Sequence, residues 1–149
     1  MKLQRLTGVG RPIVWSCWSN RAIVYIAGGF AAARVWSRRD VGWPTAGVFA
    51  AWSLLRELAP RTHLLAPVAA LAVAPSLWRA PRDTARERAV AIGLTMMAAR
   101  IATRSTGRAP TLLDYVGLAV AAVTLPRRRQ SRAAAGLLGA AMVYERLSR

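Results

Sequence analysis

Apolar runs and basic clusters alternate along the whole chain, and this alternation is the strongest constraint on its fold. Arginines occur in every segment between six stretches of 11 to 17 residues that carry no Asp, Glu, Lys or Arg: residues 22–33, 41–55, 62–78, 89–99, 115–126 and 133–144. Short membrane helices joined by basic connectors give such a pattern. The sequence therefore predicts an all-α fold, a polytopic membrane helical bundle with about six short transmembrane segments.

The charge balance indicates the kind of partner. The chain has 22 Lys and Arg against six Asp and Glu, a formal net charge of +16, although 54% of its residues are apolar. An excess of this size indicates nucleic acid or an anionic membrane surface. Nucleic-acid-binding domains gather their arginines on one face or in one tail, whereas here they are interleaved with apolar runs. We therefore expect the lipid bilayer as partner, with nucleic acid the disfavoured alternative.

The lengths of the apolar stretches leave an alternative open. Each is shorter than the roughly 20 residues that a spanning helix needs. An arginine at a helix end can reach the headgroups, so Arg34 and Arg100 would extend the first and fourth stretches. Runs of about 10–14 apolar residues also form buried core helices, and a soluble helical bundle is therefore the competing interpretation.

Local signals predict where several helices begin and end. Proline commonly follows a helix end. Pro60 lies shortly after the second stretch, and Pro126 is the last residue of the fifth. Polar residues that can satisfy the first backbone N–H groups precede several stretches. The expected caps are, in chain order, Asn20, the box Thr84 to Glu87, the box Thr111 to Asp114, and Ser131.

An offset of 66 residues aligns the chain with itself. The informative matches are Pro-Thr and Pro-Arg pairs, because they mark helix ends: Pro44-Thr45 with Pro110-Thr111, and Pro60-Arg61 with Pro126-Arg127. We predict one membrane domain made of a basic, interfacial N-terminal lead-in (residues 1–20), a first three-helix unit (21–80) and a second one (81–149). Three spans per unit would invert the second unit, giving a 3+3 inverted repeat. A four-span protein is the main alternative.

Ionisable residues near the apolar runs are the candidate functional residues, since such groups are costly at membrane depth and often functional. For Asp114 a helix cap is the preferred interpretation, and for Arg56 and Glu57 an interfacial position at a helix end. An Arg56–Asp114 contact or a Glu57–Arg contact between the two units is a further hypothesis. The candidates for intramembrane or interface polar roles are Arg34, Arg56, Glu57, Arg100 and Asp114.

The sequence shows no catalytic or cofactor motif. It has one histidine, His63, and one cysteine, Cys17, so it has no Cys/His cluster for zinc. No glycine-rich phosphate loop follows a strand pattern, and a single histidine identifies no catalytic triad. We therefore predict no catalytic residues, no metal site and no cofactor, and we do not expect an enzyme.

These observations predict a small integral membrane protein that serves as a structural or interaction subunit, in a homo-oligomer or a larger membrane complex. The richness in Ala and Arg indicates GC-rich coding DNA, so we expect a multi-pass protein of a bacterial cytoplasmic membrane. One alternative is a small-solute transporter or channel-like protein built from the inverted repeat. The other is a soluble, basic helical protein that binds nucleic acid.

Overall fold

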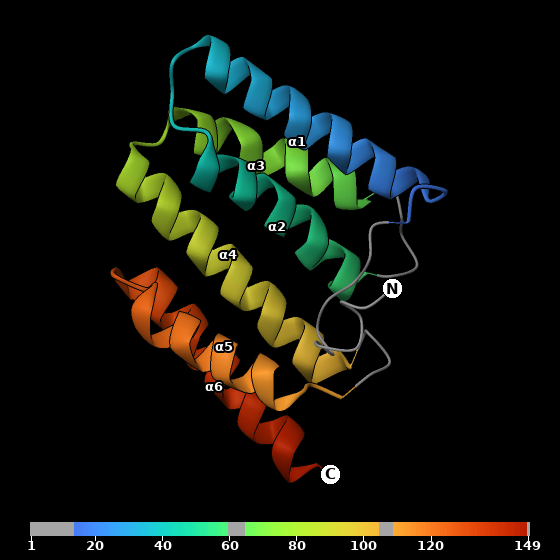
Figure 1. Cartoon of the computed structure of the whole chain (residues 1–149), viewed down its shortest axis with the longest axis vertical. Helices are drawn as coiled ribbons and strands as arrows, with labels where there is room; N and C mark the ends of the chain where they lie inside the picture. Colours follow the sequence, from blue (N-terminus) through green and yellow to red (C-terminus); the bar gives the residue numbers. More distant parts are fainter. Residues whose placement is uncertain (1–13, 60–64, 105–108, 149) are drawn as a thin grey trace.

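Six α-helices make up most of the described chain (Figure 1). The computed structural model describes residues 14–59, 65–104 and 109–148, and this part of the chain contains no strand. The all-α, six-helix prediction is confirmed. The helices are α1 (Trp18–Trp36), α2 (Gly42–Leu58), α3 (Leu65–Arg79), α4 (Arg82–Thr103), α5 (Leu112–Thr124) and α6 (Arg129–Leu147).

The helices lie side by side, with α2 and α4 in the centre (Figure 1). α1 packs on α3 and α2, α2 packs on α3 and α4, α4 packs on α6, and α5 contacts α6. The turns α1–α2, α3–α4 and α5–α6 lie together on the left in Figure 1, and we call this the turn end. The opposite end holds the starts of α1, α3 and α5. The α2–α4 contact joins the first three helices to the last three.

Two apolar clusters form the core. One is built by α1, α2, α3 and the start of α4, and contains Ile23, Val48, Trp52, Ala66, Ala70, Leu77 and Ala85. The other lies between α4 and α6, and contains Val90, Leu94, Ala98, Ile101, Ala134, Leu138 and Ala141. Many of these side chains are small, which lets the helices approach closely. A Cβ at Gly47 would lie 2.9 Å from the Leu77 Cδ1 and 3.2 Å from the Ala89 Cβ, so glycine leaves room for α2 to pack closely against α3 and α4.

The structure supports the helical bundle but not its predicted transmembrane segments. None of the helices in residues 14–59, 65–104 and 109–148 has both the length and the apolar character required to cross a membrane.

Two of the predicted helix boundaries are confirmed. The Thr111 hydroxyl accepts the N–H of Asp114 at 3.2 Å, and the Asp114 carboxylate accepts the N–H of Thr111 at 2.8 Å, so the capping box at α5 is present. α5 then ends at Thr124, just before Pro126. Pro60, His63 and most of the predicted N-terminal lead-in lie outside the described residues.

The other predicted caps are wrong because these helices begin at other residues. α1 begins at Trp18 after Cys17, and the Asn20 amide donates instead to the Val14 carbonyl at 2.8 Å. α4 begins at Arg82 after Pro81, two residues before the proposed Thr84 box. At α6 the N-cap residue is Arg128, and the Ser131 side chain accepts the Arg128 N–H at 3.3 Å from the third helical position.

Candidate functional site

A buried ion pair connects the two central helices. The Arg100 Nε on α4 lies 3.0 Å from the Glu57 Oε1 on α2, and the Arg100 Nη2 donates to the Ser53 Oγ at 2.7 Å. Only 10% of the arginine side chain and 1% of the glutamate side chain are exposed. The hypothesis of a Glu57–Arg contact between residues 21–80 and 81–149 thus matches a contact in the structure.

Arg56, the neighbouring candidate, connects α2 to the start of α1. Its Nη1 donates to the Asn20 Oδ1 at 2.5 Å, and its guanidinium lies 4.8 Å from the centre of the Trp52 ring. The Trp52 indole N–H donates in turn to the Ser19 Oγ at 2.9 Å. These contacts explain why Ser19 and Asn20 are buried at the first turn of α1.

Arg34 is buried at the turn end, where it satisfies carbonyl groups of two other segments. Its guanidinium donates to the carbonyls of Leu77 and Trp78 at 3.3 Å each, and its Nε donates to the Asp40 carbonyl. The last carbonyls of a helix have no partner within the helix, so Arg34 completes the end of α3. Arg100 lies near the opposite end of the bundle, and each arginine has its own partners. The structure therefore does not bring Arg34 and Arg100 together.

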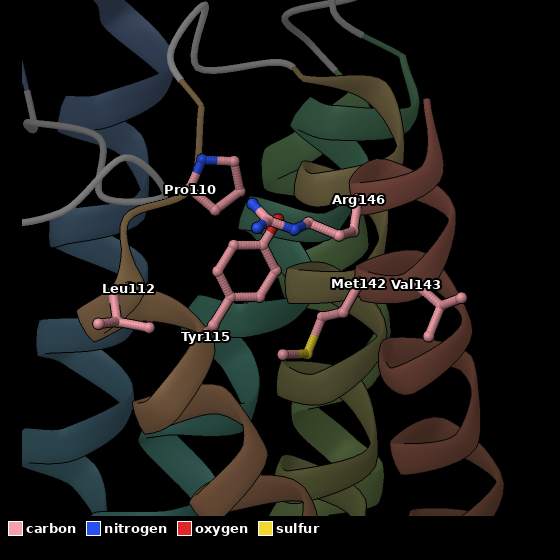
Figure 2. A pocket seen from close by; sticks show the side chains of 6 residues that line it. All are labelled: Pro110, Leu112, Tyr115, Met142, Val143 and Arg146. Carbon is pink, nitrogen blue, oxygen red and sulfur yellow. The ribbon is translucent and has the colours of Figure 1, made fainter. Parts of the chain in front are cut away.

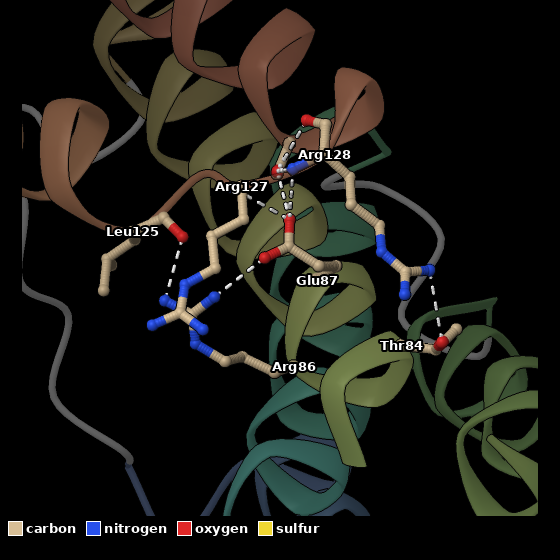
Figure 3. Close-up of polar contacts among 7 residues, drawn as sticks. Thr84, Arg86, Glu87, Leu125, Arg127 and Arg128 are labelled. Atoms are coloured by element: carbon tan, nitrogen blue, oxygen red, sulfur yellow. Dashed lines mark hydrogen bonds and ion pairs between the residues drawn. The ribbon is translucent and has the colours of Figure 1, made fainter. Parts of the chain in front are cut away.

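Glu87 has an arrangement that the sequence did not predict (Figure 3). One carboxylate oxygen accepts the N–H groups of Arg127 and Arg128 at 3.2 and 3.1 Å and the hydroxyl of Ser131. The other oxygen accepts the Arg86 Nη1 at 2.7 Å. A carboxylate is favoured at a helix N-terminus by the helix dipole. Glu87 of α4 thus fixes the start of α6.

The same contacts set the protonation of Glu87, which precedes the apolar stretch 89–99. Burial by itself would raise the pKa of its carboxyl group. The hydrogen bonds from Ser131, Arg128 and Arg127 and the positive charge of Arg86 outweigh burial, so the pKa is lower than that of an ordinary glutamate. The carboxylate is therefore ionised at neutral pH.

The remaining buried acids also link structural elements. Glu145 on α6 is 1% exposed, accepts the Tyr115 hydroxyl of α5, and lies 3.8 Å from the Arg104 Nη2. Asp114 is buried at its capping position. Four of the six acids in the chain are thus buried, and the exposed charge is dominated by arginine.

The turn end is the most basic part of the described surface. Arg39 donates to the Trp78 carbonyl at 3.0 Å, and Arg128 donates to the Thr84 hydroxyl at 3.2 Å, so the three turns are connected by arginines. Asp40 is half-buried here and Asp83 is exposed. The exposed arginines at this end are Arg38, Arg39, Arg79, Arg82, Arg88, Arg127, Arg128, Arg129 and Arg132.

Between the two ends, the outer faces of the bundle are apolar. α5 is the clearest case, because Asp114 is its only buried residue. Monomeric water-soluble proteins rarely expose contiguous apolar patches of large size. The exposed apolar side chains include Tyr25 and Trp36 on α1, Val68 and Leu71 on α3, Leu112, Leu113, Val116, Val120 and Val123 on α5, and Leu137, Val143 and Leu147 on α6.

Two grooves open at the opposite end. One, with a volume of about 510 Å³, lies between α5 and α6 (Figure 2). The other, of about 560 Å³, lies between α1 and α3. Each groove has mainly apolar walls and one arginine, Arg146 in the first and Arg21 in the second. Neither arginine was predicted from the sequence, because the grooves form only when the helices pack.

Within residues 14–59, 65–104 and 109–148, no three His, Cys, Asp or Glu side chains are grouped so as to hold a metal ion.

No protein-family model, curated protein or solved structure matches this chain. The contacts of the chain itself are therefore the basis for assigning a function.

The Glu57–Arg100 pair yields the first test. Glu57→Gln leaves Arg100 buried without its anionic partner, and removing one member of a buried pair costs about 3–5 kcal/mol. Asp83→Asn, at an exposed acid in the first turn of α4, is the control and should cost less than about 1 kcal/mol. Unfolding followed by circular dichroism in mild detergent measures both. Equal stability of Glu57→Gln and the unsubstituted protein would contradict a stabilising pair.

The lowered pKa of Glu87 predicts a pH dependence. A depressed folded pKa contributes stability that is fully present above the unfolded glutamate pKa of about 4.3, and that is lost as the pH falls through the folded value. Glu87→Gln should therefore be less stable than the unsubstituted protein at pH 7, and the difference should shrink below pH ~4. Thermal unfolding of both proteins between pH 7 and pH ~3 measures this difference in stability. A difference that does not change with pH would show that the charge of Glu87 is not what fixes α6.

Proposed function

We propose that this protein is a small helical bundle embedded in an anionic lipid bilayer, where it acts as a structural or interaction subunit. The observation that carries the proposal is the belt of exposed apolar side chains between two arginine-bearing ends. In water, each Å² of apolar surface that stays exposed loses the stabilisation of about 25 cal/mol that burial would give. In hydrocarbon the same surface costs nothing, and the arginines would lie at the headgroups.

Helix α1 has dimensions that fit this location. Trp18 and Trp36 stand at its two ends with 52% and 90% of their surface exposed. Eighteen steps of 1.5 Å place them about 27 Å apart along the axis, close to the ~30 Å thickness of a hydrocarbon core. Tryptophan is enriched at the membrane–water boundary. The pair would therefore mark the two interfaces.

The shorter helices require an adjustment of the bilayer. α5 has 13 residues, so its length is about 20 Å. A short apolar helix is accommodated when the bilayer thins and flanking side chains extend to the interface. The turn after α5 carries Arg127 and Arg128, whose side chains can do so.

The interior of the bundle is also consistent with a bilayer environment. Ionisable residues of membrane bundles face the interior and pair with one another or with backbone groups. Glu57, Glu87 and Glu145 do so here. Because these groups connect helices, they support a structural role, whereas a transport path would need polar groups left for a solute. The outer face of α5 offers a side for a second copy or a larger complex. The inverted repeat stays a prediction.

Extraction of membranes tests the proposal. The tagged protein should stay in the membrane pellet after washing at alkaline pH and high salt, which remove proteins held by charge alone. Val116→Asp combined with Val120→Asp places charge on the outer face of α5 and should reduce retention. Arg129→Gln combined with Arg132→Gln at the turn end is the matched control and should be retained.

Release of the unsubstituted protein by the wash would overturn the proposal. The arginines of the turn end would then indicate a surface for an anionic partner such as nucleic acid. The helices would form a bundle that is stable in water. Copurifying nucleic acid in the released fraction would support that alternative.

A further inference from the structure

We propose that the two grooves at the opposite end bind anionic phospholipids, with Arg146 and Arg21 as the ligands of the headgroup phosphates. The inference rests on the proposed bilayer location and adds the class of lipid and the residues that select it. Each groove would hold part of an acyl chain against its apolar walls, with the phosphate at its arginine.

The α5–α6 groove combines a cation with apolar walls (Figure 2). The Arg146 side chain extends from α6 across the groove towards Pro110 and the ring of Tyr115. Leu112, Met142 and Val143 supply the apolar walls. The volume of about 510 Å³ falls within the range of roughly 300–1,000 Å³ typical of ligand pockets.

The α1–α3 groove repeats this chemistry on another pair of helices. Its walls include Trp18, Tyr25, Pro67 and Leu71, and its cation is Arg21, one turn into α1. Both grooves thus lie at the same end of the bundle, and each joins one arginine to aromatic side chains that favour the membrane interface. Two grooves with the same composition would bind lipids of the same leaflet.

Both arginines are available for an external anion. In the described part of the chain, neither guanidinium takes part in a hydrogen bond or ion pair with the protein. The acid next to Arg146 in sequence, Glu145, is buried and bound to Tyr115 and Arg104. It therefore leaves the charge of Arg146 unneutralised in the groove.

The composition of the grooves selects an anionic phospholipid among anions. A guanidinium binds phosphate through two parallel N–H donors. A free, hydrated phosphate would gain nothing from the apolar walls, and a nucleic acid would have to leave them exposed. A phospholipid with a net negative headgroup satisfies the cation and covers the walls at once, whereas in a zwitterionic lipid the choline cation would oppose the arginine.

Lipid retention measures the inference directly. The full-length protein is purified in mild detergent, mixed with phosphatidylglycerol or phosphatidylcholine of matched chains, and examined by native mass spectrometry. We expect up to two tightly held phosphatidylglycerol molecules and several-fold less phosphatidylcholine. Arg146→Gln and Arg21→Gln should each abolish binding of one phosphatidylglycerol molecule, and the double variant should abolish binding of both. Arg129→Gln combined with Arg132→Gln removes the same charge at the turn end and should keep both lipids.

Equal retention of the two lipids, or unchanged phosphatidylglycerol binding in the double variant, would overturn the inference. An equal loss in the turn-end control would also overturn it, because binding would then follow net charge alone. Circular dichroism of each variant verifies that the helices are intact. A protein that remains in alkaline-washed membranes but fails these tests refutes the lipid sites alone, whereas release by the wash refutes the bilayer location itself.

Discussion

The buried pair between Glu57 and Arg100 is the interaction on which the rest of the bundle depends. It lies between α2 and α4, where the first three helices meet the last three. Further along the α2–α4 contact the packing uses small residues such as Gly47 and Ala89, and small apolar surfaces alone specify helix register poorly. If one helix slid along the other, Glu57 and Arg100 would separate. Each buried charge would then be unpaired, which is strongly destabilising. We therefore infer that the pair sets the register of α2 against α4.

Burying the acids determines the character of the surface. Glu57, Glu87, Asp114 and Glu145 all contribute to contacts inside the chain, and the outside is left with arginines at the ends and apolar side chains between them. In water such a surface would favour association. In a bilayer it matches the order of headgroup, hydrocarbon and headgroup, which is why one feature of the sequence accounts for both the fold and the proposed location.

The sequence predicted the features that depend on local pattern. The alternation of apolar and charged residues located six helices, and Thr111 with Asp114 located the start of α5. Thr84 and Glu87 have the same local pattern, yet Glu87 binds N–H groups 40 residues away, so a tertiary partner outweighed a local cap. The grooves at Arg21 and Arg146 could not be predicted, because each is formed by two helices whose neighbours only the packing defines.

The most direct test of the bilayer location is the environment of the outer face of α5. Spin labels at Val116, Val120 and Arg129, introduced singly into a Cys17→Ser background, would be compared in anionic vesicles by their collision rates with oxygen and with a water-soluble nickel complex. A bilayer location predicts that labels at Val116 and Val120, both exposed in the bundle, collide with oxygen but not with nickel, while a label at Arg129 collides with nickel. Strong nickel access at Val116 and Val120 would show that this face lies in water and would contradict the bilayer location.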